Sequence, residues 1–189
     1  MILPIIAYGD PVLKKKAIEI DAQYPDLKKL VENMFDTMHG AKGIGLAAPQ
    51  VGLSIRLFIA DGSPFQEDEE LKAFKKVFIN PTIIREKGKK CTINEGCLSI
   101  PEVREDVERL DTIEISYLNE NFEEKNEEFS GMKARIIQHE YDHIEGILFT
   151  DRLSILKKTM LKNRLDDVSK GKISADYKMK FPPAKKKRR

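Results

Sequence analysis

The five residues His-Glu-Tyr-Asp-His at positions 139–143 constrain the fold of this chain more than any other stretch. Two histidines four positions apart project from one face of a helix, where both can bind one divalent metal ion. The glutamate between them can face a water on that ion. The pattern therefore predicts a central helix that begins after Ser130 and Gly131, ends at Gly146 and carries a metal site.

Hydropathy along the rest of the chain predicts further helices and strands around one core. The predicted helices cover residues 25–39 and a later segment that ends at Gly171 and has Leu153, Leu156, Met160 and Leu165 on one face. The predicted strands cover residues 54–59, 76–79 with a turn at Asn80-Pro81, 112–117, and a polar stretch from the turn at 119–121 through Phe129. The acidic segment 61–70 is expected to be a surface loop. Strands that precede helices indicate an α+β fold, with small antiparallel or mixed sheets packed around the histidine-bearing helix and a C-terminal helix.

The composition is that of one globular domain. The chain has 189 residues, of which 41% are hydrophobic and 34% charged, and a domain of this length buries a core that needs no disulfide. Two cysteines are too few for a secreted disulfide framework, and no apolar run approaches the roughly 20 residues that cross a bilayer. The first residues lack the basic region of a signal peptide. We expect a cytoplasmic protein without membrane contact, in which residues 1–169 form a single catalytic domain.

A catalytic metal of this type needs a third protein ligand and an open position for water. A histidine in the extended form of the motif would stand at position 149, where this chain has Phe149, and no glutamate occurs after residue 145. A downstream aspartate, Asp151 or Asp166, would make the site that of a metallo-endopeptidase. An upstream ligand is favoured, and Cys97 is the strongest soft candidate. A lone cysteine is more often a small buried apolar residue, so spacing alone leaves the third ligand open.

Three stretches together resemble the signature motifs of the peptide deformylases in order and spacing. They are GIGLAAPQ at 43–50, EGCLSIP at 95–101 and QHEYDH at 138–143, and the opening YGDPVL at 8–13 also looks like the start of that family. The resemblance covers about residues 2–165. It implies the peptide deformylase fold, a metal held by Cys97, His139 and His143, and an active-site Glu140. It also implies hydrolytic removal of the formyl group, as formate, from the N-terminal formylmethionine of newly synthesised polypeptides.

This chemistry gives roles to further groups. Glu140 would take a proton from the attacking water and deliver it to the leaving amine. Attack on the formyl carbon creates an oxyanion, for which the Gln50 side-chain amide and the Leu98 backbone N–H are the candidate donors. Gly43 and Gly45 would let an extended substrate approach and add to a strand edge. The resemblance implies Fe²⁺ as a common native metal, and Zn²⁺, Ni²⁺ or Co²⁺ suit the same ligands.

A pocket for the methionine side chain must be apolar and one side chain deep. Met132 and Ile136, about two turns and one turn before the first histidine of the motif, and Ile44 are the candidates, with ordinary core packing as the competing interpretation. Asp142 is close enough to orient a metal-bound imidazole or else forms a structural salt bridge. His39 is expected to be a capping or surface residue.

The chain ends in a basic segment. From Lys170 onward it has nine basic residues and one acid, a net charge of +8, whereas the preceding residues carry 24 basic and 30 acidic side chains, a net charge of −6. Residues 170–189 are expected to form a flexible tail that is either solvated or drawn to the RNA phosphates of the ribosome. Because no motif residue lies beyond His143, removing the chain after Gly171 is expected to leave hydrolysis of a small formyl-peptide nearly unchanged. The body is acidic, so sequence-specific nucleic-acid binding is not expected.

Overall fold

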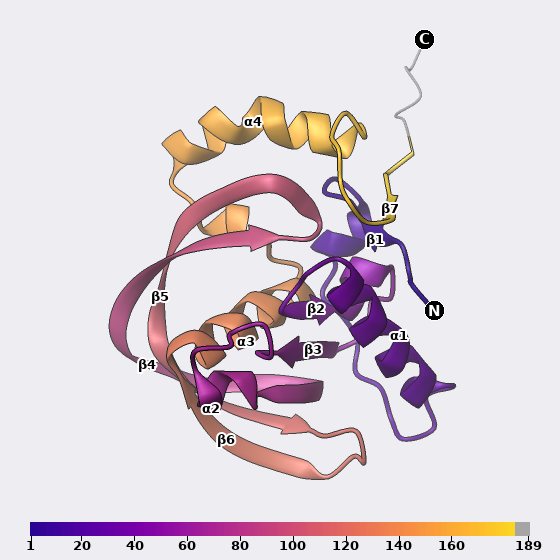
Figure 1. Ribbon diagram of the computed structural model, residues 1–189, viewed down its shortest axis with the longest axis vertical. Coiled ribbons are helices and arrows are strands. Elements are labelled where there is room, and N and C mark those ends of the chain that lie inside the picture. Colours follow the sequence, from indigo (N-terminus) through magenta and orange to yellow (C-terminus); the bar gives the residue numbers. More distant parts are fainter. Residues whose placement is uncertain (184–189) are drawn as a thin grey trace.

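In the computed structural model, which describes residues 1–183, an antiparallel sheet has the strand order β2-β3-β4-β5-β6 (Figure 1). Its strands are β2 (Gly45–Ala47), β3 (Leu57–Asp61), β4 (Lys75–Cys97), β5 (Ile100–Leu118) and β6 (Glu124–Ser130). A second, parallel pair consists of β1 (Ile5–Ile6) and β7 (Met179–Lys180). The mixture of sheets and helices confirms the predicted α+β class.

The histidine-bearing helix lies against the sheet. The helices are α1 (Leu27–Gly40), α2 (Glu69–Lys72), α3 (Gly131–Ile144) and α4 (Ile155–Ser169), with the 3₁₀ turns η1 (Pro11–Lys14), η2 (Ala48–Val51) and η3 (Phe149–Arg152). Ile136 and Ile137 of α3 are buried in one apolar cluster with Phe58 and Phe78 of the sheet. Each such side chain contributes roughly 1.5–3 kcal/mol when buried, so packing fixes the place of α3 at the centre of the fold.

Strands β4 and β5, which form a hairpin, are much longer than the strands predicted at 76–79 and 112–117. The strand predicted to end at Asn80-Pro81 continues to Cys97, because a bulge between Ile79 and Thr82 absorbs the irregular residues within the ladder. Asn80 there has a positive φ of 48°, and its side-chain amide donates to the carbonyl of Ile20 at 2.7 Å. Most of the next dozen residues are exposed and polar, so they carry no hydropathy signal for a strand. Hydrogen-bond pairing with β5 holds these residues in a strand and places Cys97 at the tip of the hairpin.

Two other local predictions were wrong in detail. Leu156 and Met160 of α4 do not pack on the body, since they are 71% and 75% exposed. The buried face of α4 instead comprises Leu161, Leu165 and Val168, which pack in the apolar cluster beneath the β4–β5 hairpin. Of the segment 61–70, Asp61 ends β3 and residues 62–68 form a loop, and the Asp68 side chain accepts the Leu71 N–H at 2.9 Å and caps α2.

The basic C-terminal segment is not a free tail over its described part. Strand β7 pairs with β1, with the Ile5 N–H donating to the Lys178 carbonyl at 2.8 Å and the Ala7 N–H to the Lys180 carbonyl at 2.9 Å. Residues 178–180 are thus paired with the body by main-chain hydrogen bonds, whereas the sequence predicted a flexible tail from Lys170 onward. The prediction for 184–189 lies outside the described residues.

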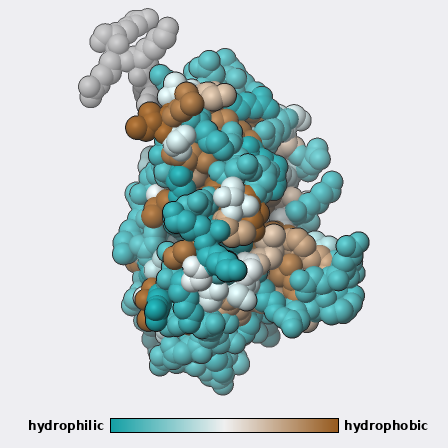
Figure 2. Space-filling model, turned by 90° about the vertical axis from the view of Figure 1, so that its left-hand side faces the viewer, coloured by the Kyte–Doolittle hydropathy of each residue, from teal (hydrophilic) through white to brown (hydrophobic). Residues whose placement is uncertain are grey.

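The surface matches the high charged fraction of the sequence. Figure 2 shows hydrophilic side chains over most of one face, with hydrophobic side chains gathered in smaller areas. Among residues 1–183, none of the helices combines the length and hydrophobicity that crossing a bilayer requires.

Candidate metal centre

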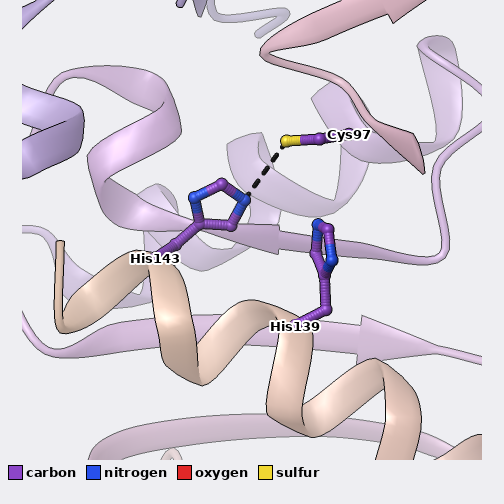
Figure 3. Close-up of side chains that lie close together, drawn as sticks. All are labelled: Cys97, His139 and His143. Carbon is purple, nitrogen blue, oxygen red and sulfur yellow. Dashed lines mark hydrogen bonds between the residues drawn. The ribbon is translucent and has the colours of Figure 1, made fainter. Parts of the chain in front are cut away.

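Three side chains with metal-binding atoms meet between the hairpin tip and α3. Cys97 is the last residue of β4, and His139 and His143 are one turn apart on α3, so all three point into the same space (Figure 3). One donor atom from each lies within 4.8 Å of the others, and the Cys97 Sγ is 3.2 Å from the His143 Nε2. A thiolate and two imidazoles form tetrahedral sites with bonds of about 2.0–2.3 Å. The donor set and its spacing therefore fit a divalent ion.

The orientation of His139 is set by Glu95. The Glu95 Oε2 lies 2.9 Å from the His139 Nδ1, which leaves the other ring nitrogen to face Cys97 and an ion. Asp142, which the sequence suggested for this task, instead pairs with Arg109 at 2.7 Å and with Arg152. Of its two interpretations, the salt bridge is therefore the one observed. Sequence reasoning did not predict that Glu95 orients His139, although Glu95 stands only two residues before the candidate ligand Cys97.

A network of buried charges surrounds this carboxylate. Glu95 accepts from Arg109 Nε at 2.7 Å and from Arg135 Nη1 at 2.8 Å, and all three side chains are at most 5% exposed. Burial alone would raise the pKa of Glu95, but hydrogen bonds from His139 and Arg109 hold that pKa well below its usual range. Glu95 therefore stays charged beside His139. Neither arginine stands in a motif that single-sequence reasoning could recognise.

Glu140 lies on the opposite side of the same space, against β2. Its side chain is buried, and a Cβ added at Gly45 would lie only 2.8 Å from its Cδ, so the position of this carboxylate requires glycine there. Within residues 1–183 its Oε2 has no hydrogen-bond partner. Burial raises the pKa of Glu140 to about 7. A buried carboxyl with a pKa near neutrality and a free oxygen is suited to proton transfer.

The Gln50 amide is held in one orientation. Its Oε1 accepts the Ala47 N–H at 2.8 Å, which turns its Nε2 toward the Cys97 Sγ and the Ser99 Oγ, each at 3.4 Å. Gln50 lies in the 3₁₀ turn that follows β2 and is 1% exposed. Leu98 follows Cys97 in the turn between β4 and β5. The two predicted oxyanion donors thus lie on adjacent sides of the cysteine.

These groups open onto one cavity of about 740 Å³. It is lined by every site residue predicted from the sequence except His143, namely Gly43, Ile44, Gly45, Gln50, Cys97, Leu98, Met132, Ile136, His139 and Glu140. Met132 and Ile44 are partly buried against the core cluster that contains Ile136. These three side chains therefore both pack in the core and line the cavity. Residues 174–177, which the sequence did not connect with the site, also line this cavity.

The other candidate ligands lie elsewhere. Asp151 accepts the Leu148 N–H at 2.7 Å and pairs with Lys14, and Asp166 pairs with Lys170 on the surface of α4. The metallo-endopeptidase alternative, which needed one of these aspartates as third ligand, is therefore wrong. His39 is 43% exposed and pairs with Asp61 of β3 at 2.9 Å.

Comparisons with known proteins agree on one family. The model of the polypeptide deformylase family matches residues 2–159. The peptide deformylase of Christiangramia forsetii is 61% identical over the whole of both chains, and that of Flavobacterium johnsoniae is 53% identical, also over the whole of both. The crystal structure of peptide deformylase from Thermotoga maritima aligns with a TM-score of 0.74 at 39% identity, over 82% of this chain and 99% of that one. Peptide deformylase 1B of Arabidopsis thaliana aligns with a TM-score of 0.81 at 35% identity, over 90% and 92%.

Proposed function

Because this chain belongs to the polypeptide deformylase family, which removes the N-formyl group from nascent peptides, we propose that Cys97, His139 and His143 hold the metal on which its hydrolysis depends. The observation that carries this ligand set is the approach of one sulfur and two imidazole nitrogens to within 4.8 Å of one another. We expect Fe²⁺ in the native protein, and Zn²⁺, Ni²⁺ and Co²⁺ suit the same donors. When bound, the ion supplies Lewis-acid activation of water and of the formyl oxygen.

Glu140 moves the protons of the reaction. Its carboxylate takes a proton as water attacks the formyl carbon, and its carboxylic acid returns that proton to the nitrogen of the departing methionine. The unpartnered Oε2 and a pKa near 7 support both halves of this cycle, since neither protonation state is strongly disfavoured at neutral pH. Gly45 contributes by leaving room for the carboxylate beside β2.

The Gln50 amide and the Leu98 N–H stabilise the oxyanion. The hydrogen bond from the Ala47 N–H fixes Gln50 with its Nε2 toward Cys97, so the donor is oriented before substrate arrives. Loss of one oxyanion donor typically costs about 10²–10³ in rate.

The peptide binds along β2 and places its methionine among apolar side chains. β2 is an edge strand of the sheet, so an extended peptide can add to its free side through the backbone at 43–45. Ile44, Met132 and Ile136 line the cavity beside it and supply the apolar surface that a methionine side chain requires.

The protein works in the cytoplasm on chains that leave the ribosome, and its basic C-terminal residues can bind it to the ribosome. Five of the six residues at 184–189 are basic, and such a cluster binds RNA phosphate with an affinity that falls steeply with salt. Truncation after Pro183 should weaken co-sedimentation with ribosomes at about 50 mM salt. Equal co-sedimentation of the two forms would show that this segment is no tether.

The reaction is tested with anaerobically purified protein and a formyl-Met dipeptide, by measuring formate. We expect formate release that decays in air for the iron form and persists after replacement by Ni²⁺. A formyl-Asp dipeptide is the matched control, because the apolar pocket disfavours a carboxylate. Absence of formate from metal-loaded protein would overturn the proposed function, and equal rates for the two dipeptides would overturn the proposed pocket.

A further inference from the structure

The segment after α4 returns to the centre of the molecule. α4 ends at Ser169, and Gly171, with a φ of 69°, turns the chain back. Residues 174–177 then line the active-site cavity, and β7 follows beside β1 (Figure 1). A part of the chain without a catalytic motif thus forms one wall of the site.

Tyr177, immediately before Lys178 and β7, bonds directly to the hairpin tip. Its hydroxyl donates to the Leu98 carbonyl at 2.8 Å, across 79 residues of sequence. A tyrosine hydroxyl has an ordinary pKa of about 10 and is therefore a donor through the neutral range, and burial raises the pKa of Tyr177 further. This hydrogen bond favours the orientation of the turn in which the Leu98 carbonyl faces Tyr177.

Both ends of the chain hold the same turn. The Tyr8 N–H, just after β1, donates to the Ser99 carbonyl at 2.8 Å, next to the carbonyl held by Tyr177. The Gln50 Nε2 also donates to the side chains of Cys97 and Ser99, on either side of Leu98. Among residues 1–183, the Leu98 N–H itself donates to no other group. The turn is thus fixed through its carbonyls, and this N–H stays available to a ligand.

We propose that Tyr177 is a positioning residue for deformylation, which holds the turn so that the Leu98 N–H meets the oxyanion. The inference rests on the proposed role of that N–H as an oxyanion donor. It makes the segment after α4 part of the active site, and it reverses the sequence-based expectation that the chain beyond Gly171 is dispensable for a small substrate. Since complete loss of one donor costs about 10²–10³ in rate, a donor that is retained but poorly aligned should cost about tenfold.

The test compares the full-length, Ni²⁺-loaded protein with Tyr177→Phe, which keeps the ring and removes only the hydroxyl. With a formyl-Met dipeptide we expect kcat to fall about tenfold, because the donor acts in the transition state, while KM and bound metal stay within about twofold. Tyr24→Phe is the matched control, since Tyr24 precedes α1 and does not line the cavity. It should behave as wild type.

Hydrogen exchange separates positioning from general destabilisation. In Tyr177→Phe the amides of residues 97–100 should exchange faster while those of α3 keep their protection. Unchanged kcat, or faster exchange throughout the protein, would contradict the proposal. An inactive wild-type enzyme would instead refute the proposed function, so the two failures are distinguishable.

A pair of truncations gives an independent test. Ending the chain after Ser174 removes Tyr177 and β7, whereas ending it after Pro183 keeps both. We expect kcat on the dipeptide to fall at least tenfold in the first and to stay within twofold in the second, with activity expressed per bound metal. Equal activity of the two truncated forms would contradict the proposal.

Discussion

The two cysteines, 97 and 91, provide a matched test of the ligand set at the scale of single residues. Cys97 lies 3.2 Å from the His143 Nε2, whereas Cys91 is a half-buried residue further back in β4 and outside the donor group. Cys97→Ala should lose stoichiometric metal and activity, because two imidazoles alone hold a divalent ion weakly. Cys91→Ala should keep both. Full metal content in Cys97→Ala, measured by elemental analysis, would exclude the thiolate as a ligand.

Glu140 should be separable from the metal ligands. Glu140→Gln keeps the shape of the side chain and removes its proton chemistry, so bound metal should be retained while kcat falls by 10²–10⁴ or more. Gln50→Ala should be milder, since in the proposed mechanism the Leu98 N–H would still donate to the oxyanion. A Glu140→Gln enzyme within tenfold of wild type would remove Glu140 from the mechanism.

Sequence reasoning proposed His139, Glu140 and His143 from one short motif, but it did not predict the contacts that Glu95 and Tyr177 make with the site. His139, Glu140 and His143 share one helical turn, so their geometry follows from helix periodicity. Glu95 and Tyr177 act through contacts 44 and 79 residues away along the chain. Such contacts depend on how the hairpin and the C-terminal segment fold back, which local pattern does not encode.

At the scale of elements, Arg109 joins β5 to α3. It pairs with Glu95 and Asp142 while only 2% exposed, so Arg109→Met would leave two buried carboxylates without this partner. Removing one member of such a network typically costs about 3–5 kcal/mol. Urea denaturation should show a loss of this size. Arg104→Met, on an exposed part of the same strand, should change the free energy of unfolding by about 0.5 kcal/mol or less, and an equally small loss in Arg109→Met would show that the network adds no stability.

The same network predicts a pH dependence of stability. The pKa of Glu95 lies below its ordinary value of 4.5 in the folded protein, so its contribution is complete above that value and is lost as pH falls toward the folded pKa. The difference in unfolding free energy between wild type and Glu95→Gln should therefore stay constant from pH 7 to about 5 and shrink as pH is lowered from there to 3. A difference that stays constant between pH 5 and 3 as well would show that the charge of this carboxylate does not stabilise the fold.

Among the elements themselves, amphipathic segments and segments flanked by turns were predicted, whereas the exposed strand residues that follow Asn80 were not. α1 and β6 occur close to their expected positions because their apolar spacing or flanking turns are local signals. The outer half of the β4–β5 hairpin was missed because its residues are exposed and its strand state comes from pairing. The buried face of α4 was misjudged because two apolar faces compete and only the tertiary contact decides between them.

At the scale of the whole molecule, the site depends on the two ends of the chain as well as on its motifs. β1 and β7 pair, and the residues flanking them, Tyr8 and Tyr177, hold the carbonyls of Ser99 and Leu98. Because these hydrogen bonds join the segment after α4 to β1 and to the turn at 98–99, that segment lies against the body. The charge of that segment predicted a tail, but charge carries no information about strand pairing.

The central claim, that Cys97, His139 and His143 hold the catalytic ion, is tested most directly by anomalous diffraction from a crystal of the Ni²⁺-loaded protein. We predict one strong peak between the hairpin tip and α3, about 2.0–2.3 Å from the Cys97 Sγ and from one nitrogen of each histidine. The peak should persist in Glu140→Gln and vanish in Cys97→Ala. A peak without Cys97 in its coordination, or one ligated by Glu140, would contradict the account.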